Sequence, residues 1–382
     1  MRVGIPVEVA AGETRVAANP DIVRKLTTAG IDVVVEHDAG VRAHFADAAY
    51  ADAGAKIEGK AEAFGADVVC KVNKPTVDEV RLMKRGAALV AMLEVYSDDG
   101  TVAALASQGV DAFALEKMPR ITRAQSMDVL SSQANIAGYR AVLEAARIYG
   151  RFVPMMMTSA GSAKPARVVV LGAGVAGLQA IATARRLGGQ VWSYDVRPEV
   201  KEQIQSLGAK FIELDVGESG AGAGGYAKQL SEDAQRRQQQ LLTEELKKAD
   251  IIISTALIPG KRAPVLITED AVKGMRAGAV IVDLAAANGG NCPLTEAGKT
   301  VTKHGVVLCG ITNFPALTPT DASSFFARNV YNFLMLVVEQ QGSAWRLKSD
   351  FLADEITAGT LITHQGQVRS TTPAPAAKQQ AG

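Results

Sequence analysis

The chain has 382 residues, and its 41 basic and 40 acidic side chains leave a formal net charge of only +1. This balance gives no electrostatic reason to expect a nucleic-acid partner or attachment to an anionic membrane surface. The length allows two or three domains, each with its own hydrophobic core.

Few residues suit disulfides, metals or membrane insertion. The three cysteines show no pairing pattern, which fits a reduced, cytoplasmic compartment: Cys70, Cys292 and Cys309. The four histidines lack the spacing of metal ligands, so we expect no metal. The chain begins without a signal segment, and the longest apolar stretch near its end, residues 333–338, is too short to cross a bilayer.

The chain up to residue 115 alternates between short apolar runs and segments of helical spacing. Strands are predicted at residues 3–6, 32–36, 68–72, 88–92 and 112–115. Helical spacing lies between them, as at 21–29 and 77–84. This alternation is typical of a parallel sheet, so the region is predicted to be an α/β domain of its own.

Residues 166–195 read as a strand, a turn, a helix and a second strand. The turn is a GxGxxG sequence in which Gly172 permits the sharp bend, Gly174 lets a pyrophosphate approach and Gly177 lets helix pack on strand. The following helix supplies free N–H groups for phosphates, beginning near Val175. A tight turn without a ligand is the alternative, but the complete unit favours dinucleotide binding.

Asp195 ends the second strand of this unit, about 20 residues past the turn, where a carboxylate can accept both hydroxyls of an adenosine ribose. A carboxylate would repel a 2′-phosphate, so NAD(H) is favoured over NADP(H). Arg197 could in principle receive a phosphate, stack on the adenine or lie in solvent.

Further strands follow at residues 210–212, 251–254, 280–283 and 306–308, giving about six strands in a second sheet. The three residues that directly follow the central strand, 251–254, should border the nucleotide: Thr255, Ala256 and Leu257. The predicted fold class is therefore α/β, with two Rossmann-like doubly wound parallel-sheet domains joined by long helices at 132–147 and 323–338. The predicted division is 1–131 with 318–369, then 132–317, and a disordered tail at 370–382 that is rich in Pro, Ala and Gln.

Two polar segments are candidates for contact with the nucleotide. Residues 118–139 gather side chains that could orient a nicotinamide carboxamide, namely Arg120, Gln125, Asp128, Ser131 and Tyr139. An ordinary polar helix cap with surface charges is the alternative. The glycine-rich stretch 217–226 suits a hinged loop whose Gly225 and Tyr226 close over a ligand, or else a disordered insertion.

The segments 118–128, 131–133, 138–141 and 172–184 resemble the NAD(H)-binding component of proton-translocating nicotinamide nucleotide transhydrogenase. Residues 224–228, 255–260 and 289–294 fit as well. The resemblance covers nearly the whole chain up to the tail. It implies hydride transfer between NAD(H) bound here and NADP(H) on a partner subunit, coupled to proton translocation by a membrane-spanning subunit. It also implies a homodimer at the cytoplasmic face of the inner membrane.

Alanine dehydrogenase has a similar fold and must be distinguished. Its substrate lysine and catalytic histidine are matched here by Asn73 and Glu94. Interconversion of an amine and an imine needs a proton shuttle and an anchor for the substrate carboxylate, and both are missing unless Lys74 or Glu94 substitutes. An amino-acid dehydrogenase and a non-catalytic NAD(H)-sensing module remain the alternatives.

Overall fold

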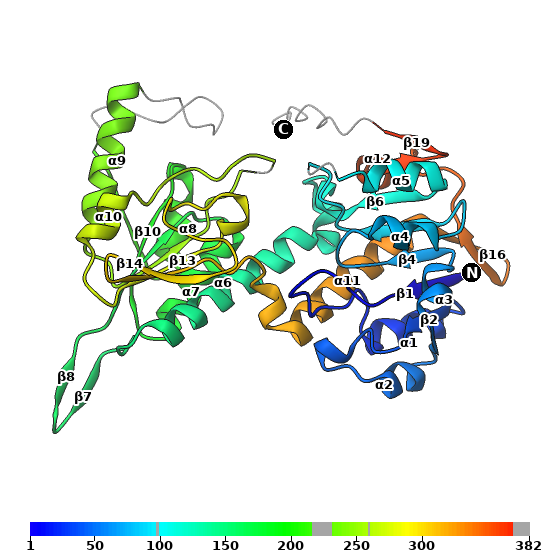
Figure 1. The fold of residues 1–382 in the computed structure, drawn as a ribbon, viewed down its shortest axis with the longest axis horizontal. Helices are drawn as coiled ribbons and strands as arrows, with labels where there is room; N and C mark the ends of the chain where they lie inside the picture. The colour runs from blue at the N-terminus through cyan, green and yellow to red at the C-terminus, as the bar shows by residue number, and fades with distance from the viewer. Residues whose placement is uncertain (97–98, 216–230, 259, 370–382) are drawn as a thin grey trace. The chain divides into compact units, whose positions relative to one another are not determined.

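The computed structural model describes residues 1–96, 99–215, 231–258 and 260–369. The chain forms two compact units, unit 1 from Met1–Gln133 with the chain from Ala316 onward, and unit 2 from Ala134–Pro315. Each contains its own mostly parallel sheet (Figure 1). The predicted fold class is confirmed, with the qualification that both sheets carry antiparallel edge strands.

Unit 1 holds an eight-stranded sheet in the order β19-β18-β6-β5-β4-β1-β2-β3, in which the strands from β6 to β3 are parallel. Its strands are β1 Arg2–Ile5, β2 Asp32–Glu36, β3 Lys56–Glu58, β4 Val68–Cys70, β5 Ala88–Ala91, β6 Asp111–Ala114, β18 Leu361–His364 and β19 Gln367–Val368. Its helices are α1 Pro20–Thr28, α2 Asp47–Asp52, α3 Lys60–Phe64, α4 Val77–Arg81, α5 Thr101–Gln108, α11 Pro319–Val337 and α12 Glu355–Thr360. A separate hairpin joins β16 Val338–Gln341 to β17 Ala344–Leu347.

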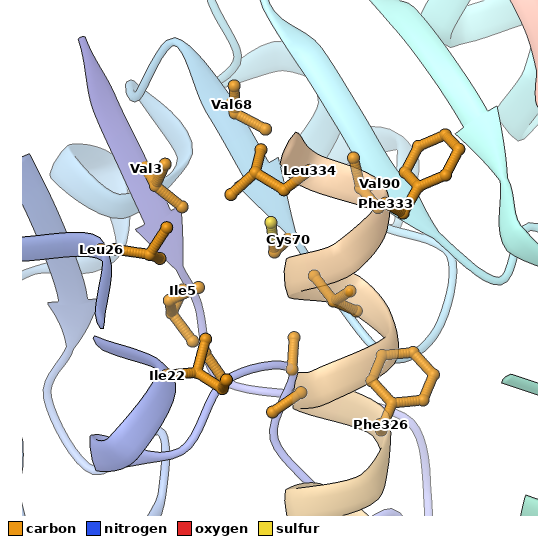
Figure 2. Close-up of a cluster of buried hydrophobic side chains, with 14 of the residues drawn as sticks. Val3, Ile5, Ile22, Leu26, Val68, Cys70, Val90, Phe326, Phe333 and Leu334 are labelled. Carbon is orange, nitrogen blue, oxygen red and sulfur yellow. The ribbon is translucent and has the colours of Figure 1, made fainter. Parts of the chain in front are cut away.

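The core of unit 1 is built from segments far apart in the sequence. Figure 2 shows α11 placing its apolar side chains against the sheet, with Leu334 near β4 and Phe333 near Val90 of β5. Phe333 also meets Phe113 edge to face, with ring centroids 5.4 Å apart. Burial of each such side chain contributes about 1.5–3 kcal/mol, so α11 is held in this unit by its packing.

Unit 2 holds a seven-stranded sheet in the order β11-β10-β9-β12-β13-β15-β14. Its strands are β9 Arg167–Leu171, β10 Gln190–Tyr194, β11 Lys210–Phe211, β12 Ile251–Ser254, β13 Val280–Asp283, β14 Thr300–Lys303 and β15 Val306–Cys309. The helices are α7 Val175–Arg186, α8 Lys201–Ser206, α9 Glu232–Leu246 and α10 Glu269–Gly274, and α6 Val129–Ile148 contains the break between the units. A hairpin of β7 Met156–Thr158 and β8 Gly161–Ala163 projects from the rest of unit 2 (Figure 1).

Two of the strands missing from the sequence prediction are short or polar. β14 reads Thr-Val-Thr-Lys and pairs antiparallel with β15 at the sheet edge, so it lacks the apolar run that marks a buried strand. β3 has only three residues. Within the described residues, no helix is both long and apolar enough to cross a membrane.

Candidate functional site

The glycine-rich turn joins β9 to α7 in unit 2. Gly172 has a φ of +93°, a conformation that L side chains rarely adopt, and a Cβ on Gly177 would lie 1.8 Å from the carbonyl oxygen of Gly172. These two positions therefore need glycine for the fold itself. By contrast, a Cβ on Gly174 would meet no atom within 4 Å, which leaves open space beside the turn.

The start of α7 faces this space without a side-chain cap. Gly174 is the N-cap residue and Val175, the first helical residue, is 42% exposed. The first N–H groups of a helix have no partner within the helix, and its dipole places partial positive charge there. The turn and helix can thus hold a diphosphate through backbone groups alone.

Thr255 places a second loop against the same turn. β9 and β12 are adjacent parallel strands at the point where the strand order reverses, the usual ligand crevice of such sheets. Thr255 follows β12, and its Oγ1 donates to the carbonyl oxygens of Leu171 at 3.0 Å and Gly172 at 3.2 Å. Leu257, two residues further on, is 50% exposed.

Asp195 is already fully engaged at the end of β10. Its Oδ2 accepts from the N–H of Ala173 at 2.7 Å, and Arg197 binds both carboxylate oxygens through its side chain. Burial raises the pKa of Asp195, but the hydrogen bonds from Arg197 and Ala173 outweigh it and keep this pKa below its ordinary value. Arg197 thus pairs with Asp195, an arrangement that none of the three sequence-based alternatives included.

A buried polar network supports the loops after β12 and β13, and the sequence analysis did not find it. Asp283 is fully buried and accepts from the N–H groups of Asn291 and Cys292 and from the Thr295 hydroxyl. Asn291 in turn donates to the carbonyl oxygen of Ala256 at 2.9 Å. The sequence did hold one signal of this network, because Asp283 ends the apolar strand β13 and a buried carboxylate needs hydrogen-bond partners.

The predicted nicotinamide-contacting residues divide between the units. Asp128 accepts from the Ser131 N–H at 2.9 Å and the Ser131 hydroxyl at 2.6 Å, so it caps α6 as the alternative interpretation expected. Arg120 and Gln125 are exposed in unit 1. Tyr139 belongs to unit 2 and is 41% exposed. Two further predicted residues, Gly225 and Tyr226, lie outside the described residues.

Unit 1 buries an ionic cluster where alanine dehydrogenase is expected to bind its substrate. The guanidinium of Arg15 binds both oxygens of Glu13, at 2.8 and 2.7 Å, and donates to Gln133 at 2.9 Å. Asn73 donates to Glu13 at 3.0 Å. Arg15 and Glu13 are only 5% and 1% exposed, so the guanidinium is already paired with a carboxylate inside the protein.

The Glu13 carboxyl makes a pH-dependent contribution to stability. Burial alone would raise its pKa, but hydrogen bonding and charge from Arg15 outweigh burial and bring the pKa down from 4.5 to about 2. Because the folded-state pKa is depressed, the contribution is complete above pH 4.5 and is lost as the pH falls toward about 2. The shift corresponds to about 3 kcal/mol of unfolding free energy.

We therefore expect the difference in unfolding free energy between the native protein and Glu13→Gln to shrink as acid protonates Glu13. Denaturant titrations across that pH range measure it. The neighbouring Glu8 has a pKa raised by burial, opposed by Lys71 and raised further by the charge of Glu13, so the pH dependence that Glu13→Gln removes includes this coupling. A difference independent of pH would contradict the ionised pair.

Lys74 and Glu94 lie together in unit 1, but they do not form a free acid–base pair. The Lys74 amino group contacts Glu94 at 3.5 Å and Asp99 at 2.5 Å. Burial lowers the pKa of Lys74, while Asp99 and Glu94 raise it overall above its ordinary value. Lys74 therefore stays protonated at neutral pH and is a poor general base.

One histidine does gather with acids on the surface of unit 1. His37, Asp38 and Asp47 offer ligand atoms within 4.8 Å of one another, although histidine spacing in the sequence gave no sign of it. Exposed acidic groups often meet in this way without an ion, so the cluster alone defines no metal site.

Comparisons with known proteins cover nearly the whole chain. Residues 4–137 match the family described as "Alanine dehydrogenase/PNT, N-terminal domain", and residues 141–371 match its C-terminal domain. A chain from Rhodospirillum rubrum, the first portion of an NAD(P) transhydrogenase alpha subunit, is 50% identical over 377 residues, which is 96% of this chain and 97% of that protein. The chain belongs to the alanine dehydrogenase/PNT family.

Within this family the likeness is greater to the transhydrogenase subunits. A solved transhydrogenase from Sinorhizobium meliloti is 44% identical with a TM-score of 0.88, covering 97% of this chain and 100% of that one. A solved L-alanine dehydrogenase is 27% identical with a TM-score of 0.79, covering 96% of each chain. The resemblance to transhydrogenase expected from the sequence is confirmed.

Proposed function

We propose that this chain is the NAD(H)-binding subunit of a proton-translocating NAD(P) transhydrogenase. It exchanges a hydride with NADP(H) held on a partner subunit, and another subunit moves protons across the membrane. The observation that carries the proposal is the glycine turn at the point where the strand order of unit 2 reverses, in a chain 50% identical to a transhydrogenase subunit. Through its partners the chain would lie at the cytoplasmic face of the inner membrane.

The residues of unit 2 fit NAD(H) through geometry and charge. Gly172 and Gly177 shape the turn, and the space beside Gly174 with the N–H groups near Val175 would receive the pyrophosphate. Asp195 would accept the adenosine ribose hydroxyls. Its four acceptor positions are taken by Arg197 and Ala173, so Arg197, whose side chain is 46% exposed, must release one or more of them.

The nicotinamide would be oriented by the exposed polar residues that precede α6. When bound, the ring supplies a hydride at its C4 atom and needs no protein acid or base for the transfer. Arg120 and Gln125 offer donors and an acceptor for its carboxamide, Asp128 and Ser131 fix the start of α6, and Tyr139 borders the ring. Positioning is thus the main task of this chain.

Turnover of an amino acid by this chain alone is disfavoured by the side chains of unit 1. Arg15 is bound to Glu13 and Gln133, Asn73 carries no charge, and Lys74 stays protonated. These side chains therefore supply neither an anchor for a substrate carboxylate nor a proton acceptor.

Mixing the purified chain with an NADP(H)-binding transhydrogenase subunit tests the proposal. Reduction of a spectrally distinct NAD⁺ analogue by NADPH should require both proteins. A pair that binds both nucleotides but transfers no hydride would refute it, and reductive amination of pyruvate by the chain alone would favour an amino-acid dehydrogenase.

We further infer a homodimer, and the β7–β8 hairpin supports it. The hairpin and the residues just before it expose apolar side chains: Phe152 58%, Met155 63% and Met157 75%. An exposed apolar cluster on a projecting hairpin is typical of an interaction surface, because a two-stranded hairpin gains little stability alone.

Replacing both Met155 and Met157 by aspartate should convert a dimer of the 40.0 kDa chain to a monomer, measured by sedimentation. The cause is the cost of burying two charges in an apolar contact. Val265→Asp, at another exposed apolar position of unit 2, should leave the dimer intact. A double variant that stays dimeric would place the interface elsewhere.

A further inference from the structure

One buried asparagine of unit 2 holds both the outgoing and the returning chain after β12. Asn291 is fully buried, and its side-chain amino group donates to the carbonyl oxygens of Ala256 at 2.9 Å and Pro264 at 2.8 Å. Its amide oxygen accepts from the hydroxyl of Ser254, the last residue of β12. An asparagine amide offers two N–H donors and one acceptor oxygen, so both ends of this side chain are in use.

The backbone of Asn291 is fixed as firmly as its side chain. Gly290 precedes it with a φ of +73°, which lets the chain turn so that the N–H of Asn291 donates to Asp283 Oδ2 at 2.8 Å. A Cβ on Gly290 would lie 2.8 Å from that same oxygen. The carbonyl oxygen of Asn291 accepts from the N–H groups of Leu266 and Ile267, both at 3.0 Å. Asn291 is thus a fixed point against which the chain after β12 is held.

The strand register places this part of the chain beside the turn that is proposed to hold the diphosphate. Leu171 of β9 pairs with Tyr194 of β10 on one side and with Ser254 of β12 on the other, so the three strands end level with one another. The residues that follow these ends are, in order across the sheet, Asp195, Gly172 and Thr255. A nucleotide whose adenosine ribose binds Asp195 and whose diphosphate binds the glycine turn therefore carries its nicotinamide riboside toward the residues after β12.

Residues 255–258 offer this half of the nucleotide exposed apolar surface. Thr255 is held to the glycine turn by its own N–H and hydroxyl, which donate to Leu171 at 2.8 and 3.0 Å. The next hydrogen bond along the described chain is the one that Ala256 accepts from Asn291. Leu257 and Ile258 follow, 50% and 45% exposed. The placement of these two side chains therefore depends on the asparagine amide.

We propose that Asn291 is a positioning residue for the nicotinamide riboside half of NAD(H). It fixes the backbone of Ala256 and thereby the exposed side chains of Leu257 and Ile258, against which the riboside packs. The inference rests on the proposed function. Because Asn291 is buried, it acts only through these residues, and its loss should weaken the half of the nucleotide that lies beyond the glycine turn.

Asn291→Asp tests this role because it changes the donor group and hardly changes the size of the side chain. A carboxylate would turn the two N–H donors into an oxygen that faces the carbonyl oxygens of Ala256 and Pro264, so residues 256–258 should move. Calorimetric titration of the full chain compares NADH with ADP, which has the adenosine and the diphosphate but no nicotinamide riboside. We expect NADH affinity to fall by about tenfold, as for one lost buried hydrogen-bonding partner, and ADP affinity to stay native.

A second variant and a control separate positioning from stability. Asn291→Ala removes the donors without adding a charge near Asp283, and it should lower NADH affinity selectively even if the aspartate variant fails to fold. The matched control is Thr243→Val, which removes another buried polar group of unit 2, a hydroxyl on α9 bonded to Thr268. It should lower thermal stability without changing the ratio of NADH affinity to ADP affinity.

Native NADH affinity in both Asn291 variants would overturn the inference. Equal losses of NADH and ADP affinity would also overturn it, because Asn291 would then be a general structural support of unit 2. If the unaltered protein binds NADH but transfers no hydride beside the NADP(H)-binding subunit, the proposed function fails, and the ratio of the two affinities still decides the role of Asn291.

Discussion

Gly177→Ala should weaken NADH binding severely. The added Cβ would lie 1.8 Å from the carbonyl oxygen of Gly172 and 3.3 Å from Thr255 Oγ1, and the nearer atom is backbone that cannot rotate away. The turn must therefore shift off α7, which disrupts the diphosphate cradle. We expect NADH affinity to fall by about a hundredfold or more, equivalent to about 3 kcal/mol, in a fluorescence titration.

Two other glycines of unit 2, Gly174 and Gly150, separate damage to the fold from damage to the site. Gly174→Ala introduces a methyl into space that holds no protein atom within 4 Å, so it should leave thermal stability intact yet weaken NADH binding. Gly150→Ala also meets open space, away from the turn, and should change neither. Native affinity in Gly177→Ala would show that the turn does not hold the nucleotide, and native affinity in Gly174→Ala would place the pyrophosphate elsewhere.

The local parts of this site could be predicted because the sequence encodes them in consecutive residues. A strand, a glycine-rich turn and a helix follow one another, and the demands on Gly172 and Gly177 are backbone demands that only glycine meets. The central strands were predictable for a similar reason, since their apolar runs mark burial on both faces.

The pairing of side chains could not be predicted in the same way. Asp195 and Arg197 are two residues apart, yet whether the arginine points to the carboxylate or to solvent depends on rotamers that the sequence does not state. The bond from Arg15 to Gln133 joins residues 118 positions apart, and no periodic pattern signals a contact of that kind. Likewise β14 is a polar edge strand that needs β15 beside it to form.

The buried polar residues of both units point to one physical principle. Asp283 in unit 2 and Glu13 in unit 1 are carboxylates that the fold neutralises with N–H groups, a hydroxyl or a guanidinium. Each fixes loops that follow strands of its sheet, where hydrophobic packing gives little directional control. Both networks therefore hold loop backbone in place by directional hydrogen bonds.

Gln125→Ala should slow hydride transfer strongly while leaving NADH affinity unchanged. Gln125 is exposed in the short helical turn Thr122–Met127, so its loss should not alter stability. Its amide is proposed to hold the nicotinamide carboxamide, and loss of that contact lets the ring rotate away from its reactive position. A loss of about a hundredfold is expected in stopped-flow transfer with the NADP(H)-binding subunit, because orientation acts on the reacting atoms, whereas the pyrophosphate and adenosine are proposed to bind the glycine turn and Asp195.

Asp128→Asn provides a second, independent test of the same segment. Asparagine is a good N-cap, so α6 should begin normally and keep the hydrogen bond from the Ser131 N–H. A lower rate in this variant would therefore come from the lost charge and not from a frayed helix. Gln205→Ala, an exposed glutamine on α8, is the matched control and should behave like the unaltered protein. Equal losses of affinity and rate in Gln125→Ala would mean that this residue helps to bind the whole nucleotide and does not orient its ring.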